Sequence, residues 1–123
     1  MPLDRRRIGS LAEDIAADYL AAQGLVLLHR NYRRRLGELD LIARDAADVL
    51  VIAEVRTRAS TAYGGAAASV DHFKRRRIVR AAQQLLQRER ELARMRVRFD
   101  VIVVSGVGSR APSVEWIKHA FEA

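Results

Sequence analysis

The segment GELDLIARDAADVLVIAEVR, residues 37–56, decides the fold, because it is typical of two β-strands joined by a turn. Apolar and charged residues alternate along residues 38–44, and residues 49–56 are rich in β-branched side chains. The polar cluster between them, residues 45–48, favours a turn. The segment therefore predicts a β-hairpin.

The register of this hairpin decides whether Asp40 and Glu54 project on the same face of the sheet. Directly opposed residues on antiparallel strands share a face. If Asp40 lies opposite Glu54, three residues, 46–48, connect the strands. A two-residue turn at residues 46–47 would shift the register by one position and separate the carboxylates, unless a bulge intervened.

Helices and further strands are expected on both sides of the hairpin. Apolar residues recur at three- and four-residue spacing over residues 8–20, which predicts a helix that ends before Gly24. The other expected elements are a short strand at residues 25–29, a polar loop at 30–37, a loop at 57–69, a helix with apolar residues from Phe73 to Leu86, a strand at 98–105, a loop at 106–112 and an edge strand or short terminal element at 114–117.

This order of elements predicts an α/β fold class, with a mixed β-sheet flanked by helices, in one domain spanning residues 1–123. No apolar run approaches the roughly 20 residues that a membrane-spanning helix needs. Cysteine is absent, which excludes disulfides, thiolate metal sites and thiol nucleophiles. The basic residues 1–7 are not followed by a secretory apolar segment, so we expect a soluble cytoplasmic protein.

The charge of the chain favours a polyanionic partner. Lysine and arginine number 22 against 15 acidic residues, which gives a formal charge of +7. Only Lys74 and Lys118 are lysines, so arginine dominates, and its planar fork pairs two-point with phosphate. Nucleic acid is therefore the favoured partner. The alternative is that arginine has replaced lysine in a GC-rich genome without any change in role.

Asp40 and Glu54 are the candidate catalytic residues, because each interrupts an apolar strand where burial of a carboxylate is costly. Two carboxylates and a backbone carbonyl, that of Val55, can form half of a site for a hard divalent cation. Strand alternation places Arg56 on the same face as Glu54. The alternative is a structural salt bridge between Arg56 and one of the two carboxylates, and spacing alone leaves both interpretations open.

These carboxylates belong to a series of short motifs that covers most of the chain. The motifs are Gly9 and Glu13 in the first helix, Arg30-Asn31-Tyr32, Gly37-Glu38-Leu39-Asp40-Leu41-Ile42-Ala43, Glu54-Val55-Arg56-Thr57-Arg58, Tyr63-Gly64, Lys74 and Arg98-Phe99-Asp100-Val101. In this order and spacing they resemble the YraN family of predicted endonucleases. That family is part of the PD-(D/E)xK nuclease superfamily and is related to archaeal Holliday-junction resolvases.

The resemblance implies a restriction-endonuclease-like core and a phosphodiesterase that cleaves branched or single-stranded DNA with Mg²⁺ or Mn²⁺. It implies Asp40 and Glu54 as metal ligands together with the Val55 carbonyl. It further implies Glu13 as an outer acidic residue and Lys74 as a contact to phosphate or water. For Glu13 an alternative remains, because it follows Ser10 at the spacing of a helix capping box, although Asp4 offers an earlier cap.

One residue departs from the superfamily pattern, in which the position of Arg56 is a lysine. Arginine keeps its proton at every accessible pH, so it can stabilise phosphoryl charge but cannot accept a proton. If this arginine limits the reaction, Arg56→Lys is expected to raise the cleavage rate about ten-fold, which corresponds to about 1.4 kcal/mol of transition-state stabilisation.

Two basic runs are candidate contacts to the DNA backbone. The first is residues 33–35, and the second lies on the expected second helix, where at most two of its consecutive arginines can face one duplex. The candidate contacts are Arg33, Arg34, Arg35, Arg58, Lys74, Arg75 and Arg77. Two rival functions remain, a catalytically silent DNA-binding module on the same fold and an interaction protein for acidic partners. Besides a complex with DNA, the sequence leaves open the assembly of two copies of the chain into a homodimer.

Overall fold

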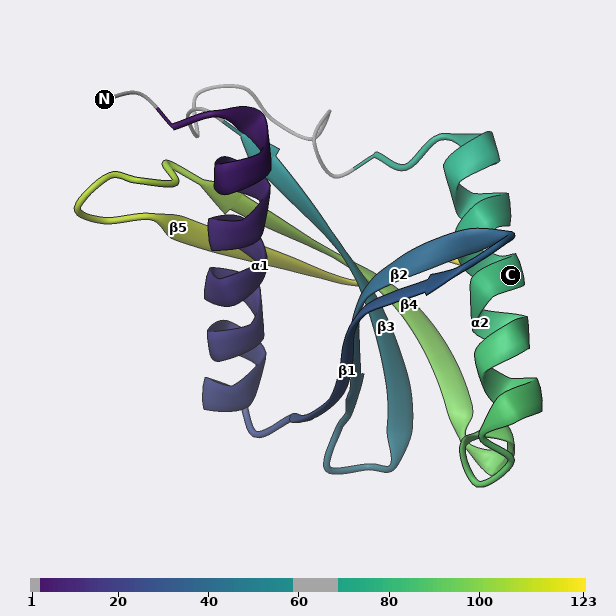
Figure 1. Cartoon of the computed structure of the whole chain (residues 1–123). Coiled ribbons are helices and arrows are strands. Elements are labelled where there is room, and N and C mark those ends of the chain that lie inside the picture. Colours follow the sequence, from purple (N-terminus) through teal and green to yellow (C-terminus); the bar gives the residue numbers. More distant parts are fainter. Residues whose placement is uncertain (1–2, 59–68) are drawn as a thin grey trace.

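The structure is a computed structural model that describes residues 3–58 and 69–123 of the chain. Within these residues, five strands form one mixed β-sheet and two α-helices pack against it (Figure 1). The elements are α1 (Arg5–Ala22), β1 (Val26–Arg34), β2 (Gly37–Arg44), β3 (Val49–Arg58), α2 (His72–Arg88), the 3₁₀ helix η2 (Leu92–Arg94), β4 (Arg96–Ser105) and β5 (Ser113–Phe121). The predicted α/β class, a mixed sheet flanked by helices, is confirmed.

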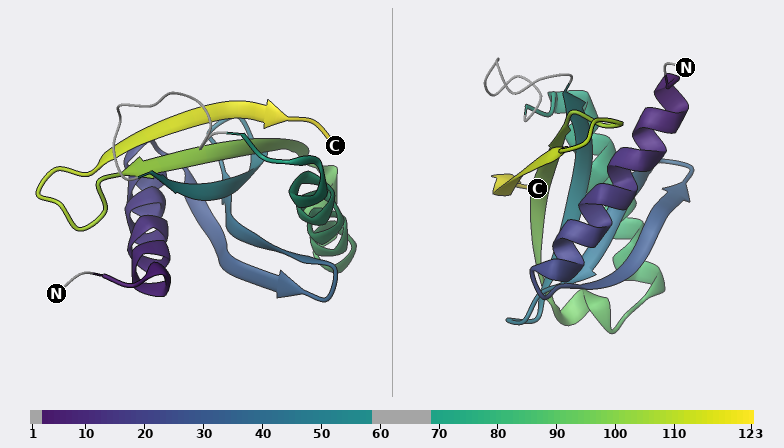
Figure 2. Two further views of the ribbon diagram at one scale, coloured as in Figure 1. Left: turned by 90° about the horizontal axis from the view of Figure 1, so that it is seen from above. Right: turned by 90° about the vertical axis from the view of Figure 1, so that its left-hand side faces the viewer.

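The strands follow one another across the sheet in chain order, from β1 to β5. Only β3 and β4 are parallel, and α2 lies in the crossover that such a pair requires. Strands β1 and β5 form the two edges of the curved sheet (Figure 2). Neither helix in the described part of the chain is long and apolar enough to cross a membrane.

The side chains of β3 alternate between two hydrophobic layers. Leu50 and Ile52 pack in the layer of α2, whereas Val51 and Ala53 pack in the layer of α1. A strand that is covered on both faces needs apolar side chains at successive positions, which explains the continuous apolar run of β3. The carboxylate of Glu54 stands at the end of this buried run.

The hairpin of β2 and β3 has the register that a shared carboxylate site requires. Leu41 lies opposite Ala53, and the Asp45 N–H donates to the Val49 carbonyl at 3.0 Å. The connection is therefore the predicted three residues, 46–48, with Asp48 in the left-handed conformation that this turn needs (φ 61°). The prediction that Asp40 and Glu54 project to the same side is confirmed by this register.

The loop predicted at residues 30–37 is wrong, because β1 continues to Arg34 and turns directly into β2. Tyr32 explains the difference, since its side chain is buried and lies opposite Leu39 in the β1–β2 ladder. Only residues 35–36 separate the two strands. Gly37 follows, and a Cβ there would lie 2.5 Å from the backbone oxygen of Arg77, so glycine allows the hairpin to pack against α2.

Other boundaries differ from the predictions in length. The loop expected at residues 57–69 begins later, because β3 continues to Arg58, and most of that loop lies outside the described residues, as do Tyr63 and Gly64. Strand β5 is longer than the expected 114–117, and the short η2 was not predicted. Phe73, expected on the apolar face of the second helix, is instead 77% exposed.

Both helices begin at an aspartate whose side chain accepts a backbone N–H. Asp4 accepts from Arg7 at 2.8 Å, so α1 starts before Ser10 and the capping-box interpretation of Glu13 is wrong. Asp71 accepts from the N–H of Lys74 at 2.9 Å, which places this lysine in the first turn of α2. Neither cap uses the side chain of Glu13 or of Lys74, so both side chains remain available for contacts with the sheet.

Asp100 pairs with the neighbouring Arg98 and is the centre of a buried polar network. Its side chain is fully buried and accepts two hydrogen bonds of 2.9 Å from Arg98. The indole of Trp116 and the N–H of His119 donate to the same carboxylate at 2.8 and 2.9 Å. This carboxylate therefore joins β4 to β5 and leaves no oxygen for a ligand.

Asp100→Ala is expected to destabilise the protein by about 3 kcal/mol, because the largely buried guanidinium of Arg98 loses both of its hydrogen bonds to Asp100 and keeps only the ion pair with Asp45 at 3.6 Å. The free energy of unfolding is measured by urea titration, with the exposed Asp18→Ala on α1 as the control. A change of less than about 1 kcal/mol would show that the network contributes little.

Candidate functional site

The site begins where β2 and β3 separate. Their ladder stops at the pair Leu41 and Ala53, and the strands then diverge, β2 toward α2 and β3 past α1 (Figure 1). Beyond that pair the Asp40 side chain replaces the missing backbone partner, and its Oδ2 accepts the N–H of Val55 at 2.9 Å. Asp40 is thereby held between the two strands, next to Glu54.

The surroundings of Glu54 shift the pKa of its carboxyl group upward. Only 7% of the residue is exposed, and this burial raises the pKa of Glu54 to about 8, together with a hydrogen bond to Asp40 and the negative charge of that residue. The positive charge of Lys74 acts in the opposite direction on this pKa. Burial and the neighbouring charge of Asp40 therefore favour the neutral form of the Glu54 carboxyl group.

Lys74 reaches this pair from α2. Its Nζ lies 3.4 Å from Glu54 Oε2, as an ion pair without hydrogen-bond alignment, and that buried oxygen has no hydrogen-bond partner in the described residues. Lys74 precedes Ile78 by one helical turn and therefore continues the stripe of α2 that faces the sheet. An ammonium and an unsatisfied carboxylate oxygen thus face each other at the end of the core.

Glu13 approaches from α1 and completes a group that we call the carboxylate site, namely Glu13, Asp40, Glu54 and Lys74. Burial raises the pKa of Glu13, and the charge of Asp40 raises it further, whereas a hydrogen bond from the Asn31 side chain lowers it. The structure therefore brings Glu13 to Asp40, as the resemblance implied.

Asn31 is a site residue to which sequence reasoning gave no role. It has a left-handed backbone (φ 51°) and lies at a gap in the β1–β2 ladder, between the pairs of Arg30 and Tyr32. Asparagine tolerates this conformation better than most residues. The only signal in the sequence was its place in the quoted Arg30-Asn31-Tyr32 motif.

Arg56 occupies the motif position but does not contact the carboxylates. It is half-buried on β3, two residues after Glu54, and makes no hydrogen bond or ion pair within the described ranges. The cation that contacts Glu54 is Lys74, from a different element. The structure therefore supplies the lysine of the site from α2.

The candidate DNA contacts divide into two groups. On the β1–β2 hairpin, Arg33 lies 3.5 Å from Glu38, and Arg34 stacks on the Tyr32 ring at 4.3 Å. Arg35 is exposed at the tip, and the tip packs against the backbone of Arg77 on α2. The three hairpin arginines and Arg77 therefore lie where the tip of the hairpin meets α2.

The second group points elsewhere. Arg75 donates to the Val70 carbonyl at 2.6 Å and lies over the ring of Phe121, on the β5 side of α2. Arg58 donates to Ser105 at 3.1 Å and approaches Glu115 at 4.0 Å. The structure does not bring Arg58 and Arg75 together with the hairpin arginines.

The residues present fit a hard divalent cation. In a strand the N–H and C=O of one residue point to the same edge, so the Val55 carbonyl shares the side on which its N–H meets Asp40. Asp40, Glu54 and this carbonyl would offer oxygen ligands, which Mg²⁺ and Mn²⁺ prefer. The described residues hold no cluster of three or more His, Cys, Asp or Glu with metal-binding geometry, so water or phosphate would complete the coordination.

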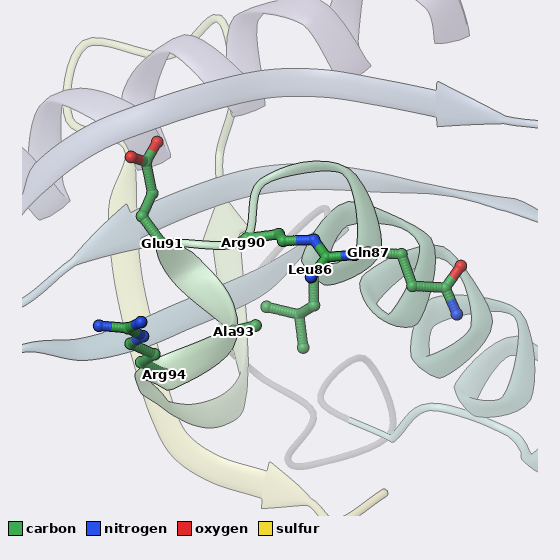
Figure 3. A pocket seen from close by; sticks show the side chains of 6 residues that line it. All are labelled: Leu86, Gln87, Arg90, Glu91, Ala93 and Arg94. Carbon is green, nitrogen blue, oxygen red and sulfur yellow. The ribbon is translucent and has the colours of Figure 1, made fainter.

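A hollow of about 780 Å³ lies apart from this site (Figure 3). It is lined by Leu86, Gln87, Arg90, Glu91, Ala93 and Arg94, from the last turn of α2 to η2. Lys74 stands at the opposite end of α2. The hollow therefore contributes nothing to the carboxylate site.

Glu54→Gln is expected to make the protein less sensitive to pH between about 4.5 and about 8. In this window folded Glu54 keeps a proton that the unfolded chain has released, so wild-type stability falls as the pH rises. The variant should therefore gain stability relative to wild type as the pH approaches the upper end of this window. Urea titrations with chelator at the two limits measure this, and the exposed Glu91→Gln is the control. Parallel pH profiles would contradict the assignment.

The carboxylate site lies within the part of the chain that is similar to known proteins. The model of the uncharacterised protein family UPF0102 matches residues 12–104, which include all four residues of the site. A UPF0102 protein of Methylococcus capsulatus is 48% identical over 94% of this chain and 90% of its own length. One from Pseudomonas entomophila is 45% identical over 93% and 92%, and one from Alkalilimnicola ehrlichii is 43% identical over 99% and 92%. The chain therefore belongs to the UPF0102 family.

Proposed function

We propose that the protein is an endonuclease that hydrolyses DNA phosphodiester bonds with Mg²⁺ or Mn²⁺. The observation that carries the proposal is the buried, unsatisfied Oε2 of Glu54, which lies beside Asp40 and 3.4 Å from the Lys74 ammonium. Two carboxylates that repel each other at the end of a core are costly to keep without a function. A divalent cation bound between the two carboxylates would offset this repulsion.

Each residue of the site has a role in this proposal. Asp40, Glu54 and the Val55 carbonyl hold the cation, which when bound polarises phosphate and activates water. Lys74 orients the water or stabilises phosphoryl charge from the side of α2. Glu13 supports the site from α1, and Arg56 supplies further positive charge near the phosphate.

The order of elements supports a restriction-endonuclease-like PD-(D/E)xK core. A helix with Glu13 precedes an antiparallel hairpin that carries Asp40 and Glu54. A crossover helix then contributes Lys74 and leads to the strand that pairs parallel to β3. This arrangement gathers acidic residues from α1, β2 and β3 at one end of the central strand, as the resemblance to the nuclease superfamily implies.

A second candidate is a DNA-binding module on the same fold that does not cleave. Arg56 in the place of the motif lysine favours it, because arginine cannot exchange protons. Such a module would bind DNA equally well with and without a divalent cation.

The two candidates are separated by one set of substrates. Labelled linear, flap and four-way DNA are incubated with purified protein and Mg²⁺, Mn²⁺ or chelator. The proposal expects cleavage that depends on the cation and ceases with chelator. Metal-independent binding without cleavage of any substrate would favour the silent module.

The hairpin arginines are expected to contact phosphates without reading sequence. Replacement of Arg33, Arg34 and Arg35 by alanine should flatten the log-log salt dependence of DNA affinity by roughly two units and weaken all sequences alike. The matched control removes the same charge at the far end of α2, as Arg88→Ala, Arg90→Ala and Arg94→Ala together. If the log-log salt dependence of DNA affinity is the same for the two triple variants, the affinity depends on net charge and not on the position of the arginines.

A further inference from the structure

An aromatic side chain stands exposed directly beside the carboxylate site. Phe73 is 77% exposed although it adjoins Lys74 in the first turn of α2. The described part of the chain has only three other exposed large hydrophobic residues, and one of them, Leu36, occupies the tip of the β1–β2 hairpin with 45% exposure. Both side chains expose apolar surface to water. Each has a basic neighbour along the chain, Arg35 before Leu36 and Lys74 after Phe73.

Helix geometry places Phe73 on the hairpin side of α2. Phe73 and Arg77 are one turn apart and therefore lie about 40° from each other around the helix. The backbone of Arg77 lies against Gly37, which directly follows Leu36. Figure 1 shows the tip of the β1–β2 hairpin beside α2. Arg75, by contrast, turns to Phe121 on the other side of the helix. Phe73 thus lies on the side of α2 that packs against the hairpin tip.

The packing of the core does not explain Phe73. The buried core residues of α2 are Ile78, Ala81, Ala82 and Leu85, with Val79 and Leu86 packed against them, and Phe73 is not in this group. Its ring makes an edge contact with the neighbouring ring of His72, at 5.9 Å between centroids. The residue can therefore change without loss of the core.

The surroundings of Phe73 match one kind of ligand. Lys74, Arg77 and the arginines of the hairpin tip attract phosphate, and an exposed aromatic ring offers a flat apolar face. Unpaired nucleotides combine a phosphate with a base whose face is free to stack, whereas the bases of a duplex cover one another. An aromatic ring among cations is the usual platform for such nucleotides.

We propose that Phe73 stacks on an unpaired base of the DNA whose phosphate enters the carboxylate site. The protein thereby selects DNA with unpaired nucleotides, single-stranded or at a branch, over continuous duplex. This inference rests on the proposed function for the nature of the ligand, and it adds the residue that determines the substrate class.

The test measures binding in the presence of chelator, so that it does not depend on cleavage. Fluorescence anisotropy gives the affinity for a labelled single strand, for its duplex and for a duplex with a single-stranded flap. Phe73→Ala is expected to weaken binding to the single strand and the flap about 5- to 50-fold and to the duplex less than about two-fold. The salt slope should stay unchanged, because stacking releases no counterions. Phe73→Trp should retain the preference.

Two further measurements distinguish stacking from other roles. A 2-aminopurine base in the single strand should lose fluorescence on binding to wild type and Phe73→Trp but not to Phe73→Ala. Val26→Ala, which removes another exposed side chain from the distant start of β1, should change nothing. Equal weakening of all substrates, or none, would overturn the inference, as would a Phe73→Ala variant that changes only the oligomeric state.

The outcomes remain separate from those of the proposed function. If Phe73→Ala loses the preference for unpaired DNA while no protein cleaves, stacking stands and the catalytic proposal fails. If wild type cleaves with metal and Phe73→Ala binds and cleaves all substrates as wild type does, the catalytic proposal stands and the stacking role fails.

Discussion

Asp40→Asn is expected to lower Mg²⁺-dependent cleavage at least about 1,000-fold, because it removes one of the two charged ligands of the proposed metal site. The amide oxygen can still accept the Val55 N–H, so the separation of β2 and β3 is preserved. Affinity for DNA should stay equal or rise slightly, since the variant loses one negative charge. Initial rates on linear, flap and four-way DNA measure the loss, and anisotropy in chelator measures the affinity.

The matched control for this variant is Asp18→Asn, an exposed carboxylate on α1 that faces away from the site. It should cleave at the wild-type rate. An Asp40→Asn variant that keeps more than about a tenth of the wild-type rate would show that this carboxylate is not a metal ligand. If wild type itself cleaves none of the substrates with either cation, the silent DNA-binding module becomes the better account.

The hairpin that carries Asp40 and Glu54 could be predicted because two independent features of the sequence agree. The polar cluster limits the connection to residues 46–48, and the apolar residues of both strands must face buried layers. A slip by one residue would have turned the side chains of β2 to the opposite face. Local sequence therefore determines this register.

The role of Glu13 could not be decided from the sequence, because two local interpretations had equal support. The spacing from Ser10 fits a capping box, and only the cap at Asp4 shows that the helix starts earlier. The length of β1 was missed for a similar reason. Its polar residues resemble a loop, and the burial of Tyr32 against β2 overrides this local preference.

The contact between Lys74 and Glu54 could not be predicted from the sequence. Strand alternation correctly places Arg56 on the face of Glu54, and on that basis Arg56→Lys is the change expected to raise the rate. The distance from Lys74 to Glu54, in contrast, depends on how α2 crosses over the sheet. Twenty residues of chain separate the two, part of them outside the described ranges.

This contact changes the expected result at position 56. A lysine already stands 3.4 Å from Glu54, so Arg56→Lys should alter the cleavage rate less than about three-fold. Lys74→Met keeps most of the apolar stem but removes the ammonium, and it should lower the rate about 100-fold or more at saturating DNA. Single-turnover rates and separate affinity measurements distinguish this loss from weaker binding.

Lys74→Arg and the combination of Lys74→Met with Arg56→Lys show what the ammonium does. If Lys74 acts only as a positive charge, Lys74→Arg should retain most of the rate, whereas a role in proton exchange predicts a loss close to that of Lys74→Met. In the combined variant, recovery of about ten-fold would show that a lysine on β3 can replace the one on α2. An unaffected Lys74→Met variant together with a faster Arg56→Lys variant would place the functional lysine at the motif position and contradict the assignment to α2.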